Sequence, residues 1–247
     1  MYLGVDYYPE HWDYEMIDDD LNNILELGSN VIRIGEFAWH MMESTEGNYD
    51  FSYFDRVIKK AKEKNLKVIF GTPTATMPAW LAKKHPDVLS EFEDNTKRVF
   101  GGRRQYCFNS KTYIDYSRKI ITELANHYKN EKNIVAWQID NEFGHEGSDL
   151  CYCDNCKNEF RNYLKNTYGN DINKLNEIWG TVFWSQTYND FDEIPLPTKT
   201  ITTHNPSLRM EWERFRSISV EKYAKMQVDL LKEILGKDTV VIHDFSG

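Results

Sequence analysis

Residues 134–144, IVAWQIDNEFG, combine an apolar run with a polar end. Gln138 and Asp140 interrupt the run before Asn141 and Glu142 close it. Short apolar runs of this kind, each followed by an amphipathic stretch, are typical of parallel strands joined by crossover helices. We therefore predict a parallel α/β sheet with Asn141 and Glu142 at its carboxyl edge, where such folds build their sites.

Similar runs occur on both sides of this stretch. They predict strands at residues 3–8, 30–34, 67–71, 134–140 and 239–243, with a weaker one at 182–184. Helical spacing of apolar residues predicts helices at 17–27, 55–65, 113–128, 158–168 and 205–235. The strand at 134–140 is then the fourth in the chain.

The number of predicted units bears on domain organisation. Six strand–helix units fall short of the eight that close a barrel, and the sequence stops soon after a predicted strand. Two alternatives therefore remain at this point: the sheet is open, or the chain is a truncated barrel.

Composition limits the possible partners. The 247 residues include 40% hydrophobic and 28% charged residues, which are ordinary values for a globular chain. Thirty Lys and Arg against 39 Asp and Glu give a net charge of −9, without a basic stripe. This disfavours nucleic acid and anionic membranes as partners. The opening residues lack a signal-peptide pattern, so we expect a cytoplasmic protein.

Glu142 is the candidate catalytic acid. A carboxyl held beside Trp137 and Phe143 is expected to have a raised pKa and to donate a proton near neutrality. Asn141 would then hydrogen-bond a hydroxyl beside the reacting carbon. The alternative is that Glu142 is a solvated loop acid or a helix cap. Motifs for phosphate loops, dinucleotide binding and serine hydrolases are absent from the sequence.

Several ordered motifs extend this interpretation. They are GVDYYPEHW (4–12), VIRIGEFAW (31–39), GTPTATMPAWL (71–81), RRQYCFNS (103–110), WQIDNEFG (137–144) and CYCDNC (151–156). Together they resemble the retaining β-galactosidases of glycoside hydrolase family 42, which are (β/α)₈ TIM barrels. The resemblance implies hydrolysis of terminal β-D-galactosides with retention, with Glu142 as acid/base and Asn141 and Arg103 as sugar ligands. It also implies a homo-oligomer, commonly a trimer.

The second carboxylate of a retaining mechanism has no match. The family carries its nucleophile on the seventh strand, beyond the strands predicted here. Glu36, Asp6, Glu10 and Asp244 lie near predicted strand ends, but none matches that motif. The resemblance thus implies one incomplete (β/α)₈ catalytic domain over residues 1–247, truncated after the sixth strand, with the seventh and eighth strands and any later domains absent. We expect the nucleophile to be missing and residues 1–247 alone to be inactive. Two alternatives remain: a non-catalytic carbohydrate-binding protein, and a complete hydrolase that uses Glu142 with Glu36 or Asp244.

The four cysteines form one further motif. Cys151, Cys153 and Cys156 lie close in sequence, and Cys107 is the only other cysteine. Four thiolates suit a closed, structural zinc site; two disulfides, free thiols and an iron–sulfur cluster are the alternatives. The resemblance agrees with zinc, because some family members carry a four-cysteine zinc cluster at matching positions. No organic cofactor is expected.

Aromatic residues make up 14% of the chain. The predicted strand ends are followed by four tryptophans, Trp12, Trp39, Trp80 and Trp184. Such rings either stack on a sugar or pack in the core. Trp184 lies in a segment, residues 180–190, that resembles a family stretch near the active site, and we predict it as a substrate contact.

Overall fold

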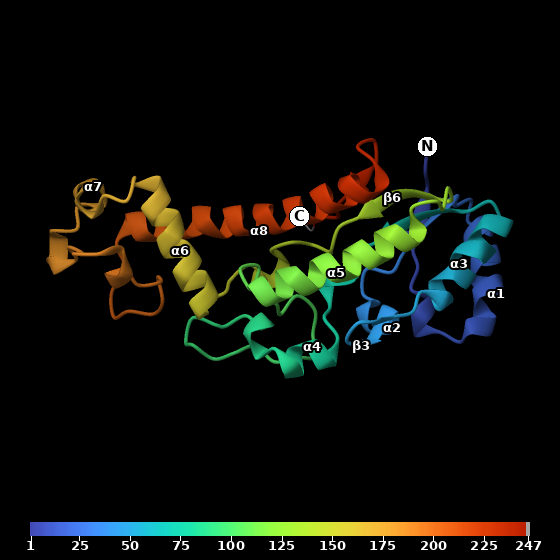
Figure 1. The fold of residues 1–247 in the computed structure, drawn as a ribbon, viewed down its shortest axis with the longest axis horizontal. Coiled ribbons are helices and arrows are strands. Elements are labelled where there is room, and N and C mark those ends of the chain that lie inside the picture. Colours follow the sequence, from blue (N-terminus) through green and yellow to red (C-terminus); the bar gives the residue numbers. More distant parts are fainter. Residues whose placement is uncertain (246–247) are drawn as a thin grey trace.

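Five parallel strands form one sheet in the computed structural model, which describes residues 1–245 (Figure 1). The strands are β1 (Gly4–Asp6), β2 (Val31–Ile34), β5 (Lys67–Gly71), β6 (Ile134–Gln138) and β7 (Val241–Ile242). Their order in the sheet is their order in the chain, as in the wall of a TIM barrel. The strand at residues 134–138 is therefore the fourth, as predicted.

Helices connect successive strands. The α-helices are α1 (Ile17–Glu26), α2 (Trp39–Met42), α3 (Ser52–Glu63), α4 (Ala79–Lys84), α5 (Lys111–Tyr128), α6 (Asp154–Thr167), α7 (Ile172–Trp179) and α8 (Pro206–Leu235). Short 3-10 helices lie at η1 (Pro9–His11), η2 (Tyr14–Met16), η3 (Pro73–Ala75), η4 (Pro86–Val88), η5 (His145–Gly147), η6 (Phe183–Ser185) and η7 (Phe191–Glu193). All five helices predicted from apolar spacing are confirmed, with ends within four residues of the predicted ones.

The larger core lies between the sheet and its covering helices. In α3, Phe54, Val57, Ile58 and Ala61 are buried and share one face of the helix, which is the spacing that a core-facing helix requires. Phe70 of β5 contacts the rings of Phe54 and Trp137 across this core. Apolar burial at these positions fixes the side of the sheet that α3 covers.

The longest helix, α8, runs along most of the molecule (Figure 1). Asn205 caps its first turn by accepting a hydrogen bond from the Ser207 N–H at 2.8 Å. Its early turns pack with α6 and α7 around a second, smaller core, and its later turns pack against α5. The helix thus joins two separately packed regions.

One predicted strand is wrong. Residues 183–185 form η6, and Val182 and Trp184 are 85% and 62% exposed. Trp184 and Ser185 both have positive φ, so this segment cannot extend into a ladder. The sheet of the described residues therefore has five parallel strands instead of six, and residues 239–243 supply the fifth. The antiparallel pair β3 (Glu43–Thr45) and β4 (Asn48–Tyr49) was not predicted.

Candidate active site

The chain makes a strained turn where β6 ends. Asp140 and Glu142 have φ values of 49° and 45°, which are unfavourable for residues with a Cβ. The buried Asp140 carboxylate supports the turn by accepting hydrogen bonds from Asn141 N–H (2.8 Å), Tyr106 O–H (2.9 Å) and Thr74 O–H (2.6 Å). This network fixes the backbone that carries the predicted acid.

The carboxylate of Glu142 is surrounded by donors. Its Oε2 accepts hydrogen bonds from Arg104 Nη1 at 2.7 Å and Asn141 Nδ2 at 3.1 Å, and forms an ion pair with Arg103 Nη2 at 3.1 Å. The hydrogen bond from Arg104, above all, lowers the pKa of Glu142 below its usual range. Glu142 is thus held as a carboxylate.

The raised pKa expected from aromatic neighbours is therefore wrong for this arrangement. The Trp137 ring lies in the core against Phe70, and the Phe143 ring stacks on His243. Neither ring takes Glu142 out of water, since its side chain is 23% exposed. Favourable charge interactions outweigh the modest desolvation.

Arg104 is the residue that the sequence analysis missed. Its side chain is only 1% exposed, and its Nη2 also contacts Glu146 Oε2 at 2.8 Å, so one guanidinium bridges two carboxylates of the same loop. The predicted sugar ligand Arg103 also reaches Glu142, but its side chain is 41% exposed. The pair RR in the sequence does not reveal which arginine turns inward.

A second charged cluster lies at the same sheet edge. Arg33 of β2 pairs with Asp6 (2.9 Å), Glu36 (3.1 Å) and Asp244 (3.1 Å). Glu36 is fully buried, and burial raises its pKa although Arg33 opposes the shift. Asp244 also accepts a hydrogen bond from Glu142 N–H at 3.3 Å. Three of the four predicted strand-end acids thus meet at one arginine.

The four cysteines come together as predicted. Their Sγ atoms all lie within 4.8 Å of one another, and every residue is buried. Cys107 Sγ is 3.5 Å from Cys153 Sγ and 3.4 Å from Cys156 Sγ. Zinc–sulfur bonds of about 2.3 Å in a tetrahedron place sulfurs about 3.8 Å apart, so this donor set fits a metal ion. No disulfide joins cysteines in the described part of the chain.

The predicted tryptophans divide into core and surface residues. Trp39 is buried and donates to Glu43 Oε2 at 2.8 Å, and Trp80 donates to the Glu43 carbonyl at 2.9 Å. Trp12 and Trp184 are 61% and 62% exposed. Trp184 stacks on Phe183, in the region of α7, and is not among the contacts of Glu142.

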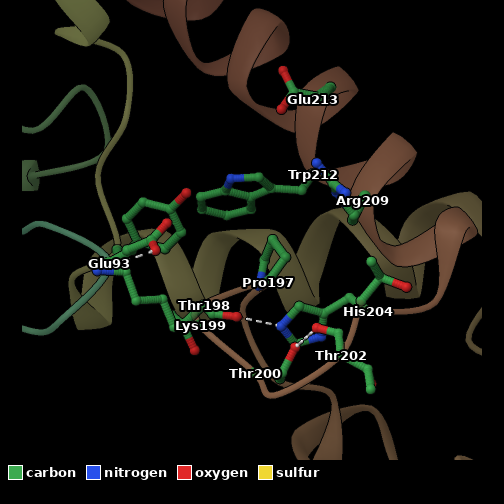
Figure 2. A pocket seen from close by; sticks show the side chains of 12 residues that line it. Glu93, Pro197, Thr198, Lys199, Thr200, Thr202, His204, Arg209, Trp212 and Glu213 are labelled. Carbon is green, nitrogen blue, oxygen red and sulfur yellow. Dashed lines mark hydrogen bonds and ion pairs between the residues drawn. The ribbon is translucent and has the colours of Figure 1, made fainter.

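An aromatic-lined cavity of that region lies beside α8. This cavity has a volume of about 300 Å³ and is lined by Trp212, Tyr152 and the segment at residues 197–204. Figure 2 shows Trp212 facing that segment. Trp184 lines a neighbouring cavity that shares His204. Glu142 lines neither cavity.

Comparisons with known proteins agree with the motifs. The family model described as β-galactosidase, glycoside hydrolase family 42, matches residues 6–247. β-Galactosidase BgaA of a Thermus species is 41% identical over 246 residues, which are 99% of this chain and 38% of that protein. Two solved β-galactosidase structures, from Marinomonas ef1 and Halorubrum lacusprofundi, align with a TM-score of 0.95. They are 39% and 40% identical, cover 99% of this chain, and are themselves covered over 37% and 36%.

The chain thus spans little more than a third of the length of these relatives. Within residues 1–245, no helix is both long enough and apolar enough to cross a bilayer.

Proposed function

The chain belongs to glycoside hydrolase family 42, and on that premise we propose that residues 1–247 form the acid/base part of a β-galactosidase catalytic domain. The observation that carries the proposal is the position of Glu142. It follows the fourth parallel strand at the carboxyl edge of the sheet and is surrounded by Asn141, Arg103 and Arg104. Barrel enzymes place their reacting groups at this edge.

The proposed reaction is hydrolysis of a terminal β-D-galactoside with retention. Glu142 protonates the departing glycosidic oxygen, and the same group later takes a proton from the attacking water. Asn141 and Arg103 offer N–H donors to galactose hydroxyls beside that carboxyl. Arg104 is too buried to reach far, so it acts mainly by orienting Glu142 and Glu146.

Glu142 must be protonated before it can act as an acid, yet the two arginines favour its ionised form. A second carboxylate about 5–5.5 Å away would raise its pKa by like-charge repulsion and compete for the arginines. We propose that this nucleophile comes from outside residues 1–247. Glu36 is fully buried, and Asp244 is occupied by Arg33 and by Glu142 N–H, so neither is free to attack a sugar.

We further propose structural zinc at Cys107, Cys151, Cys153 and Cys156. Four cysteine ligands leave no open position for water, so the metal would hold structure and take no part in the chemistry. The cluster would tie the segment that follows Arg104 to the segment that follows Glu146, and Arg104 itself contacts both Glu142 and Glu146.

We also propose a cellular compartment, an oligomeric state and one further sugar contact. Four close, unpaired thiols favour a reducing compartment such as the cytoplasm. The family resemblance favours a homo-oligomer. The Trp184 ring stacks on Phe183 and is exposed, so it is free to contact a sugar.

The test compares two aryl β-D-galactosides, one with a good and one with a poor leaving group. The natural polypeptide that contains residues 1–247 is assayed beside Glu142→Gln. We expect roughly a 10²- to 10⁴-fold loss on the poor leaving group and a much smaller loss on the good one, because only the former needs a proton. Equal losses on both substrates would remove Glu142 from the acid role.

Two controls separate the alternatives. Glu131→Gln changes an acid that pairs with Lys62 before β6 begins, and its activity should match that of the unchanged protein. NMR of the first-formed sugar distinguishes retention from the inversion expected of a complete hydrolase with a different carboxylate pair. Calorimetric binding of galactose without turnover would favour the carbohydrate-binding alternative.

A further inference from the structure

His243 lies directly after β7 and touches both sides of the turn that carries Glu142. Its Nδ1 is 2.7 Å from the Ile139 carbonyl oxygen, before the turn. Its Nε2 is 3.1 Å from the Phe143 backbone nitrogen, after the turn. The two contacts bracket the strained residues Asp140 and Glu142.

The partners of the ring determine its protonation. A carbonyl oxygen can only accept, so Nδ1 must carry a hydrogen; the Phe143 N–H can only donate, so Nε2 must offer a lone pair. Both hydrogen bonds exist together only in the neutral imidazole with its proton on Nδ1.

Packing reinforces this contact. The His243 ring stacks on the Phe143 ring, with centroids 4.3 Å apart and planes 16° apart. The next residue, Asp244, accepts from Glu142 N–H while it pairs with Arg33. His243 and Asp244, which follow β7, therefore make three hydrogen bonds to the backbone of the turn, at the Ile139 carbonyl, the Glu142 N–H and the Phe143 N–H.

We propose that His243, as the neutral Nδ1–H tautomer, is a positioning residue that holds the Glu142 turn in its strained conformation. The role rests on the proposed function of Glu142 as acid/base. His243 does not touch the carboxyl of Glu142 and acts through the backbone at Ile139 and Phe143.

Two variants test the role in the natural polypeptide. His243→Phe keeps a flat ring against Phe143 but removes both nitrogens, whereas His243→Gln restores an acceptor near the place of Nε2. We expect His243→Phe to lower kcat on the poor leaving group roughly 10- to 100-fold, with much less effect on the good one. We expect His243→Gln to recover most of that loss. The matched control is His127→Phe, because His127 is an exposed histidine that pairs with Asp55.

Two measurements need no turnover. The ¹⁵N NMR spectrum of the His243 ring should show a protonated Nδ1 and an unprotonated Nε2 at neutral pH. Hydrogen exchange of the Phe143 amide should quicken in His243→Phe and return toward its original rate in His243→Gln. A doubly protonated ring, or an unchanged Phe143 exchange rate in His243→Phe, would overturn the proposal.

These outcomes also separate the inference from the proposed function. If the unchanged protein hydrolyses no galactoside, the proposed function fails. The tautomer of His243 and the exchange rate of the Phe143 amide then still test whether His243 holds the turn. If hydrolysis is normal but His243→Phe affects both leaving groups equally, the positioning role fails and the proposed function stands.

Discussion

The sheet region and the cysteine region of the molecule, which α8 joins (Figure 1), each have a buried core. The sheet core contains large side chains such as Phe54, Phe70 and Trp137. In the cysteine region, four of the buried residues are the cysteines themselves, packed with residues such as Phe160 and Trp212. The first core consists of apolar and aromatic side chains, whereas the second combines such side chains with four thiols that fit a metal ion.

Glu142 depends on both regions. Asp140 and the end of β7 fix its backbone in the sheet region, and Arg104 fixes its carboxylate from a segment that reaches Cys107 three residues later. The loop after Glu142 continues to Cys151, so it begins in one region and ends in the other. Glu142 is therefore held from both regions: the sheet region holds its backbone through Asp140 and Asp244, and Arg104 holds its carboxylate from the segment that leads to Cys107.

Metal removal should separate the two regions most clearly. The protein is expected to hold about one zinc, whose structural binding is worth on the order of 10 kcal/mol in small zinc domains. After chelation, hydrogen exchange should rise strongly in residues 89–107 and 143–156, while amides of β2 and β5 stay protected. Uniform loss of protection would mean that both regions form a single unit.

Arg104→Met should have the next largest effect. It removes a buried cation that bridges Glu142 and Glu146, and we expect a loss of about 2–4 kcal/mol in the free energy of unfolding at pH 7. Arg104 lowers the pKa of Glu142, so the ion pair stabilises the folded state at pH values above the usual Glu pKa. This contribution to the free energy of unfolding is lost as pH falls and Glu142 protonates. Denaturant unfolding at pH 7 and pH 3 measures both effects.

Arg103→Met is the matched control for that experiment. Its side chain is 41% exposed, so its ion pair with Glu142 should contribute less than about 1 kcal/mol. Equal losses in the free energy of unfolding for Arg103→Met and Arg104→Met would contradict the expectation that the buried arginine contributes more than the exposed one.

Glu10→Gln tests the sheet region alone. Among residues 1–245, neither buried carboxylate oxygen of Glu10 has a hydrogen-bond partner, and burial raises the pKa of Glu10 to about 7. A raised carboxyl pKa makes the folded state lose stability as pH rises from about 4.5 through 7. We expect Glu10→Gln to be more stable than the unchanged protein by roughly 1–2 kcal/mol at pH 8, with the difference vanishing near pH 5. A constant difference across this range would show that Glu10 does not titrate there.

Trp184→Ala should have the smallest effect on stability. The side chain is mostly exposed, so we expect a change within about 0.5 kcal/mol in the free energy of unfolding. If Trp184 contacts sugar in the natural polypeptide, KM for a galactoside should rise while stability stays the same. A loss of several kcal/mol would mean that the ring is a packing residue.

The sequence predicted the sheet well because its strands are apolar runs with clear ends. Residues 67–71 form β5 as predicted, and the stretch at 134–144 supplies the fourth strand and, after it, Glu142. The run at 182–184 looks equally apolar, but among the described residues it has no neighbouring strand, and positive φ at Trp184 and Ser185 takes the backbone out of an extended conformation. Apolar composition alone does not distinguish a buried strand from an exposed turn.

The site was predicted less completely because charge and burial depend on tertiary contacts. The four-cysteine cluster was found, since sequence spacing and cysteine count point to it directly. Arg104 was missed as a neighbour of Glu142, since its inward turn arises only on folding. The pKa of Glu142 was predicted in the wrong direction for the same reason.

Glu142 is held as an ion-paired carboxylate at the junction of the two regions. The most direct test is ¹³C NMR titration of the Glu142 side-chain carboxyl in the 247-residue chain, assigned by the signal that disappears in Glu142→Gln. We predict a pKa below the usual value for glutamate of about 4.3. A pKa at or above that value would contradict the arrangement of Arg103 and Arg104 around the acid.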